Sequence, residues 1–307
     1  MPVKNRTRES DKRALFSGHM DKEGMDDLLD LYRDLFDLNE KNVSRVGRSR
    51  VLTAEEIQVR LQEGFALADL EDLLPDEREL AISAADVVHI LERHSEDSRS
   101  LKGDLAGLTE KPGQFLMLAK LYLTEGEEVL RKALLKIEGV NSEVLMFVLF
   151  NALKRTFLRA ASMYGSVETK NRGRGSCPVC NGEPAVSYMI GEGGKRYLIC
   201  FRCESHWRYR RLGCPFCGEE DTELSGYFYS DHEDYRNLSA SVCGSCNSYI
   251  KVWRIEGDDP GDNPPQIMDL KTPGFDLLIE DKGYLRGAPN IYGIWIGSVA
   301  EEGDSAG

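Results

Sequence analysis

All eight cysteines of this chain of 307 residues occur in Cys-x-x-Cys pairs, and the four pairs lie close together in the sequence. A Cys-x-x-Cys turn places two sulfur atoms on one side of a tight loop, so two facing turns form a tetrahedral site of four thiolates. The sequence therefore predicts two metal sites, with ligands drawn from Cys177, Cys180, Cys200, Cys203, Cys214, Cys217, Cys243 and Cys246.

Two other roles of paired cysteines fit the sequence less well. Disulfide scaffolds are typical of short secreted proteins. The first twenty residues of this chain are polar and charged, without the apolar segment of a signal peptide. Redox-active motifs of the thioredoxin kind occur singly and not four in a row. We expect reduced thiols and a cytoplasmic protein, with a dithiol redox protein as the open alternative.

The residue that follows the second cysteine of a metal-binding turn often needs a positive φ, which glycine and asparagine tolerate best. Three of the four turns provide such a residue, at Asn181, Gly218 and Asn247. Glu204 is the exception. The turn sequences thus favour metal binding independently of the cysteine count.

The lengths of the loops between the pairs indicate how the pairs combine. Nineteen residues separate the first pair from the second, and 25 separate the third from the fourth. Each of these segments contains two strand-like runs around a polar turn. Only ten residues separate the second pair from the third. The economical arrangement is two successive ribbon modules, one on the first four cysteines and one on the last four. Interleaved pairing stays open, although it would entangle the strands.

The part of the chain before the cysteines must position these modules, and it predicts helices. A capping box begins at Thr53, a second helix begins at Asp76, a third ends near Gly126, and Ser142 can cap a fourth. The fourth helix has apolar residues over a wide arc, so we expect it at the centre of a bundle. We interpret the apolar stripes as core and not as a cofactor site.

The domain limits follow from these patterns. We expect an α+β multidomain chain with an N-terminal all-α helical bundle followed by two small four-cysteine modules. The expected segments are a disordered basic tail (1–19), a helical domain (20–165), a linker (166–176), the first module (177–212), the second module with a C-terminal extension (213–297) and a disordered tail (298–307).

The composition restricts the function further. The net charge of −13 argues against a general nucleic-acid binder. The longest strongly apolar run covers residues 144–150, far short of the roughly 20 residues that a membrane helix needs. We therefore expect no membrane insertion.

A specific pattern runs through the cysteine region. It comprises Arg196-Tyr197-Leu198, then Trp207-x-x-x-Arg211-x-x-Cys214, then Cys243-x-x-Cys246-x-x-Tyr249-x-Lys251. Over about residues 175–290 the chain resembles the formate dehydrogenase accessory proteins, the FdhE family. Near the end of this region Gly283, Arg286 and Asn290 align with the family, but Pro289 precedes the asparagine where the family has a proline after it.

The resemblance implies an accessory protein and not an enzyme. Such proteins act in the cytoplasm on the catalytic subunit of a molybdenum- or tungsten-dependent formate dehydrogenase. The resemblance also implies rubredoxin-like or zinc-ribbon modules that each hold one metal ion, and four thiolates suit iron or zinc. One alternative is an iron-thiolate redox or sulfur-handling protein. A lesser one is a nucleic-acid-binding zinc ribbon, which the net charge disfavours.

Basic and aromatic residues are candidates for binding the partner. Residues 168–213 have nine basic and four acidic side chains, whereas residues 214–256 have three and eight. The basic first module could dock a protein, or hold a phosphate-bearing cofactor or RNA. Alternatively, its tryptophan packs under the cysteine turns and its arginines lie in solvent. We select as partner-binding candidates Arg196, Trp207, Arg208, Arg211 and Arg286.

A last acidic segment, Ser230-Asp231-His232-Glu233-Asp234, offers oxygen and nitrogen ligands for a third metal site. A solvated turn between two strands is the simpler interpretation.

Overall fold

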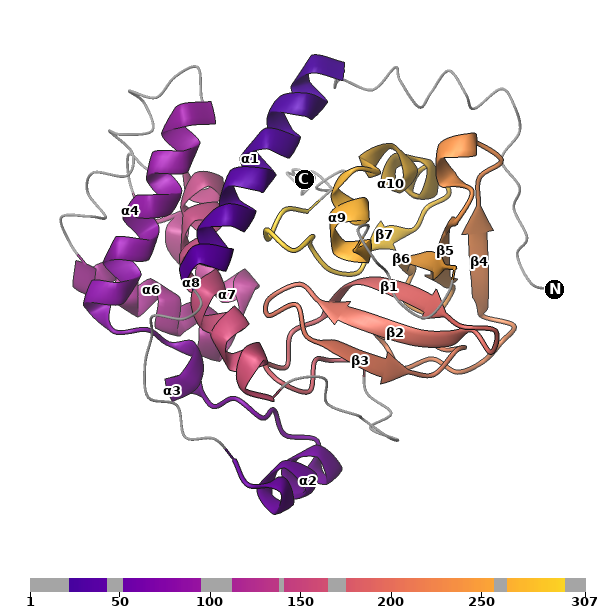
Figure 1. The fold of residues 1–307 in the computed structure, drawn as a ribbon, viewed down its shortest axis with the longest axis horizontal. Helices are drawn as coiled ribbons and strands as arrows, with labels where there is room; N and C mark the ends of the chain where they lie inside the picture. Colours follow the sequence, from indigo (N-terminus) through magenta and orange to yellow (C-terminus); the bar gives the residue numbers. More distant parts are fainter. Residues whose placement is uncertain are drawn as a thin grey trace, which may run out of the picture.

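A computed structural model of the chain describes residues 22–42, 52–94, 112–137, 141–164, 175–256 and 264–295. These residues form an N-terminal helical half, followed by a sheet that carries the eight cysteines (Figure 1). The predicted order of helices first and two four-cysteine modules second is confirmed. The predicted tails, and most of the predicted linker over 166–176, lie outside the described residues.

Five described helices of the first half pack around the longest one, α8, and α2 lies apart from it (Figure 1). The elements are α1 (Lys22–Asn42), α2 (Ala54–Glu63), α3 (Leu70–Leu73), α4 (Glu77–His94), α6 (Pro112–Glu125), α7 (Glu127–Leu134) and α8 (Ser142–Tyr164). Helix α8 packs against α1, α3, α4, α6 and α7 and is buried around most of its circumference. Its predicted central position is confirmed.

The helix starts follow the capping chemistry of the sequence. Thr53 accepts a hydrogen bond from the Glu56 amide, and the Glu56 carboxylate accepts one from the Thr53 amide, so the predicted capping box is present. Asp76 accepts from the Glu79 amide at 2.8 Å. Helix α8 is capped by Asn141 and not by Ser142, because the Asn141 side chain accepts from the Glu143 amide at 3.0 Å.

One mixed sheet spans both cysteine modules. Its strands are β1 (Pro184–Ile190), β2 (Lys195–Cys200), β3 (His206–Tyr209), β4 (Ser225–Tyr229), β5 (Leu238–Cys243) and β6 (Ser248–Ile255), in the spatial order β3-β2-β1-β6-β5-β4. Each module contributes three antiparallel strands. The parallel pair β1 and β6 joins the two sets, with Ser187 opposite Val252. The modules are thus two ends of a continuous sheet.

The C-terminal segment returns to both halves. It contains α9 (Pro265–Leu270), α10 (Pro273–Glu280) and the short β7 (Leu285–Arg286), which extends the sheet beside β6. Further on, the Tyr292 ring stacks on Tyr32 of α1 at a centroid distance of 4.8 Å, and the Tyr292 hydroxyl donates to the Tyr32 carbonyl at 2.9 Å. Figure 1 shows this segment between α1 and the sheet.

Two apolar clusters make the core. One runs without interruption from the helical half into the first module, where it includes Cys177, Phe201 and Trp207. The other lies between the sheet and α10 and includes Trp253 and Phe275. No helix in the described part of the chain is long and apolar enough to span a bilayer.

Candidate metal centres and docking cleft

The first cysteine group has the sulfur spacing of a tetrahedral metal site. Metal–sulfur bonds of about 2.3 Å place ligand sulfurs about 3.8 Å apart. The Sγ atoms of Cys177 and Cys203 lie 3.5 Å apart, and Cys180 Sγ lies 3.4 Å from Cys200 Sγ and 3.5 Å from Cys203 Sγ. All four residues are buried. The donor set therefore fits one four-coordinate ion.

The second group has the same geometry nearer to the surface. The Sγ atoms of Cys214 and Cys246 lie 3.7 Å apart, and those of Cys217 and Cys243 lie 3.6 Å apart. Cys217 is exposed, and Cys246 is partly so. The predicted sequential pairing is thus confirmed, and interleaved pairing is excluded.

Among the described residues, the side chains that gather as potential metal ligands in groups of three or more are these two cysteine sets. Within the acidic segment considered for a third site, Glu233–Tyr235 form the short 3-10 helix η3, and the His232 ring accepts a hydrogen bond from the Asp234 amide. The segment is a turn between β4 and β5.

The pKa values of the cysteine thiols differ within and between the two groups. Burial raises the pKa of Cys177 and Cys180 well above the usual range. Burial also raises the pKa of Cys246, but hydrogen bonds from the Ser248 hydroxyl and amide outweigh it and bring the value to about 7. Four thiolates at these distances need the positive charge of an ion, because like charges in a buried site oppose ionisation.

All four turns adopt the backbone expected for metal binding. The residue after the second cysteine has a positive φ in each case, namely 59° at Asn181, 56° at Glu204, 81° at Gly218 and 53° at Asn247. Glu204 thus follows the pattern although its side chain is unfavourable there. Its carboxylate lies 2.9 Å from the Nζ of Lys154, which offsets part of that cost.

Lys154 is a functional candidate that the sequence analysis missed. It lies on α8, is completely buried, and donates to the carbonyls of Phe201 at 2.9 Å and Ile291 at 2.8 Å, besides its ion pair with Glu204. It therefore ties the second cysteine turn to the helical half and to the C-terminal segment. A lysine within the apolar arc of the predicted central helix was the signal for such a role.

A buried charge cluster fixes the C-terminal segment to the second module. Lys251 of β6 and Arg286 of β7 each contact both Asp269 of α9 and Asp276 of α10, at N···O distances between 2.6 and 3.0 Å. The Tyr249 hydroxyl donates to Asp276 at 2.7 Å. Burial raises the pKa of Asp269, but the charges of Arg286 and Lys251 outweigh this effect and hold it below its usual value.

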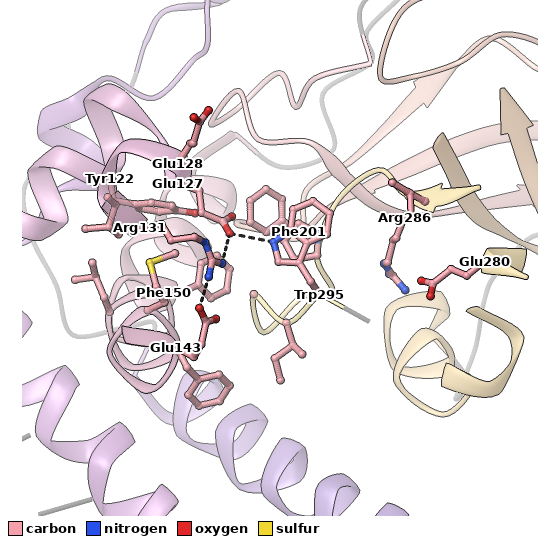
Figure 2. Close-up of a pocket in the computed structure, with 18 residues that line it drawn as sticks. Tyr122, Glu127, Glu128, Arg131, Glu143, Phe150, Phe201, Glu280, Arg286 and Trp295 are labelled. Carbon is pink, nitrogen blue, oxygen red and sulfur yellow. Dashed lines mark hydrogen bonds and ion pairs between the residues drawn. The ribbon is translucent and has the colours of Figure 1, made fainter. Parts of the chain in front are cut away.

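A cleft lies where the helical half meets the C-terminal segment (Figure 2). It has a volume of about 670 Å³ and is lined mainly by apolar side chains of α6, α7, α8, the second cysteine turn and residues 285–295. Phe201 of the cysteine turn and Phe150 of α8 are stacked in it at a centroid distance of 5.6 Å. Glutamates 127, 128, 143 and 280 also line the cleft.

Comparison with known proteins connects this architecture to a family. A family model for the central domain of FdhE matches residues 176–211, which contain the first cysteine group. The FdhE homolog of Pseudomonas aeruginosa is 35% identical over 133 residues, which cover 41% of each chain. The homolog of Haemophilus influenzae strain PittGG is 33% identical over 180 residues, which cover 57% of this chain and 58% of that relative.

The fold is similar to that of the crystal structure of the FdhE protein from Pseudomonas aeruginosa. The similarity has a TM-score of 0.57 over 87% of this chain and 93% of that one, at 19% sequence identity. This chain matches the FdhE family through its first cysteine module and is similar in sequence to FdhE homologs over about half of its length. Its matched region spans about half the length of the curated FdhE homologs.

The FdhE motif residues lie mostly inside the molecule. Arg196 and Trp207 are each only 1% exposed, and Arg286 belongs to the buried charge cluster. Arg196 and Trp207 are therefore not available on the surface, whereas Arg286 lines the cleft with its charge paired to two buried aspartates. Arg208 and Arg211 are exposed, so the structure brings only part of the predicted set to the surface.

Proposed function

We propose that this chain is an FdhE family accessory factor that binds the catalytic subunit of a molybdenum- or tungsten-dependent formate dehydrogenase in the cytoplasm and is needed for its activity. Its similarity to FdhE homologs supports an accessory role over a catalytic one. The observation that carries the docking proposal is the cleft, because it exposes apolar surface of a kind that partner proteins cover.

The cleft suits a partner segment that combines apolar and basic side chains. Leu285 and Trp295 are 54% and 42% exposed at its edge. Arg131, in turn, is already paired with Glu127 and Glu143, and the other lining arginine is neutralised in the charge cluster. Four glutamates line the cleft, and the cations that pair with three of them are Arg131 and Lys132, so the balance of charge along it is acidic. Arg208 and Arg211 are proposed as additional contacts outside the cleft.

We assign the two metal ions, iron or zinc, a scaffolding role in this function. The first site is buried within the continuous core, and Phe201 in its second turn lies in the cleft. Metal at this site would thus hold part of the docking surface in place. Elemental analysis and a visible spectrum of protein purified without oxygen distinguish the metals, because iron thiolates absorb in the visible range and zinc thiolates do not.

A capture experiment with the catalytic subunit tests the docking proposal. Leu285→Ser should reduce capture at least tenfold, whereas Leu135→Ser should not. Leu135 is a matched control because it is 71% exposed and does not line the cleft. The absence of any complex with the unmodified chain, together with normal formate dehydrogenase activity in a strain that lacks it, would refute the accessory role.

A second candidate function concerns the second metal site alone. Its Cys217 is exposed, so an iron ion there could exchange electrons, or its thiolate could carry sulfur. This hypothesis requires a reversible redox couple that disappears in Cys217→Ser while the first site keeps its metal. Zinc in both sites would refute the electron-transfer form of it.

A further inference from the structure

The face of the sheet opposite α10 contains a basic hollow that lies apart from the docking cleft and shares only Arg211 with the proposed partner contacts. Cross-strand partners lie on the same face of a sheet. Met189 pairs with Arg254, Val252 pairs with Ser239, and Ser239 pairs with Tyr229. Together with Arg211, Leu212, Tyr227, Arg236, Asn237 and Leu238, these residues line a cavity of about 380 Å³, which we call the arginine basin.

The arginine basin is positively charged in a chain whose net charge is −13. Arg211, Arg236 and Arg254 line it without any aspartate or glutamate among the lining residues. All three are exposed, and none makes an ion pair with a described carboxylate. Three guanidinium groups without a described acidic partner around one hollow are suited to a compact anion with several oxygens, such as a phosphate ester.

A fourth guanidinium, which is buried beneath the basin, adds to its positive charge. Arg196 of β2 pairs with Met189 on the same face and is buried. Its Nε donates to the Ser187 hydroxyl at 3.0 Å and its Nη1 to the Gly213 carbonyl at 3.1 Å, but its Nη2 has no hydrogen-bond partner among the described residues. No described carboxylate pairs with it, and its guanidinium lies 5.7 Å from the centroid of the Tyr209 ring, so among the described residues its positive charge adds to that of the basin.

Aromatic side chains form one wall of the basin. The rings of Tyr227 and Tyr229 stack at a centroid distance of 6.2 Å, and Tyr229 is 42% exposed. An exposed tyrosine beside several arginines offers a heteroaromatic ring a stacking surface while the arginines bind its phosphates. The volume lies within the 300–1,000 Å³ range of small-molecule sites.

We propose that the arginine basin binds a nucleotide, with its phosphates on Arg211, Arg236 and Arg254 and its ring on Tyr229. This inference is independent of the docking cleft, which lies at the junction with the helical half and shares no lining residue with the basin. Arg236 and Arg254 have no part in the proposed docking, so binding of a partner protein and binding of a nucleotide can be tested separately through these two residues.

Isothermal titration of the full chain with ADP and with pyrophosphate tests the proposal. ADP should bind with a stoichiometry of one. Arg236→Ala and Arg254→Ala should each weaken it about tenfold, the usual effect of one lost charge-assisted hydrogen bond. Tyr229→Ala should weaken ADP binding but leave pyrophosphate binding unchanged. Lys120→Ala, an exposed cation on α6, is the control and should have no effect.

Two sets of results would overturn the proposal. The first is no saturable ADP binding, or ADP binding that the arginine variants and the Lys120 control change equally. The second is tight binding of a single-stranded oligonucleotide or of a glutamate-rich peptide through the same arginines without ADP binding, which would assign the basin to a macromolecule. Because the substituted side chains are exposed, unchanged circular dichroism should accompany every variant.

Discussion

Removing one carboxylate from the buried charge cluster is the sharpest test of how the C-terminal segment is held. Asp276 is completely buried and accepts hydrogen bonds from Lys251 at 2.6 Å, Arg286 at 3.0 Å and Tyr249 at 2.7 Å. Asp276→Asn keeps the volume of the side chain but leaves two buried cations facing only Asp269. Breaking a buried ion pair on one side costs about 3–5 kcal/mol.

This cost should appear as a large loss of stability. With an unfolding entropy of about 2.1 cal/mol/K per residue, each kcal/mol lowers the melting temperature of a 307-residue chain by about 1.5 °C, so we expect a decrease of about 5–8 °C. Urea unfolding followed by tryptophan fluorescence measures the same effect, and one of the three tryptophans, Trp253, lies in the core under α10. Asp231→Asn, in the exposed turn after β4, is the control and should change stability by less than 0.5 kcal/mol.

A compensating substitution separates charge balance from packing. Lys251→Met combined with Asp276→Asn leaves one cation and one carboxylate in the cluster, so the double variant should be more stable than the sum of the single effects predicts. A loss below about 1 kcal/mol in Asp276→Asn, or strictly additive effects in the double variant, would refute the view that the cluster acts through mutual compensation of buried charges.

Three further predictions follow from the same contacts. Cys180→Ser should release one metal ion and unfold the helical half, because its cluster belongs to the continuous core, whereas Cys217→Ser should release one ion with little loss of helical circular dichroism. Equal losses of helical signal would contradict this. Glu204→Gly relieves about 1 kcal/mol of backbone strain but leaves Lys154 buried without its carboxylate, so urea unfolding should show a net loss of about 2 kcal/mol. Any gain in stability would mean that the ion pair contributes nothing. Because the folded pKa of Asp269 lies below its unfolded value of about 3.9, its stabilisation is present above that pH and is lost as the pH falls through the folded value. Urea midpoints between pH 6 and pH 3 should fall less steeply in Asp269→Asn.

The metal sites were predictable because their signal is local. The pairing of the cysteines follows from loop lengths, and the positive φ at Asn181, Gly218 and Asn247 follows from the side chains that tolerate it. Capping at Thr53 and the central position of α8 were likewise readable from a few adjacent positions. Each of these features depends on residues close together in the sequence.

The joint between the modules was not predictable in the same way. The parallel pairing of β1 with β6 connects residues more than 60 positions apart. The sequence pattern of either strand does not indicate which strand it pairs with or in which register. The burial of some charged residues was not predictable either. Arg196, Lys251 and Arg286 are of residue types that usually lie on the surface, but here they are buried. Their burial depends on partners elsewhere in the chain, namely the Gly213 carbonyl and the two aspartates.

The placement of the first metal site has a consequence for how the molecule works as a unit. The loop after α2 donates from the amides of Leu67 and Ala68 to the carbonyls of Pro178 and Val179, each at 2.9 Å. The Arg202 side chain of the second cysteine turn donates to the Tyr122 hydroxyl of α6. Lys154 of α8 donates to the Phe201 carbonyl of the same turn. Three segments of the helical half, namely this loop, α6 and α8, therefore contact the two cysteine turns directly. Since a four-thiolate turn keeps its shape only with its ion, metal binding and assembly of the helical half are linked, and the docking cleft should form only in the metal-loaded chain.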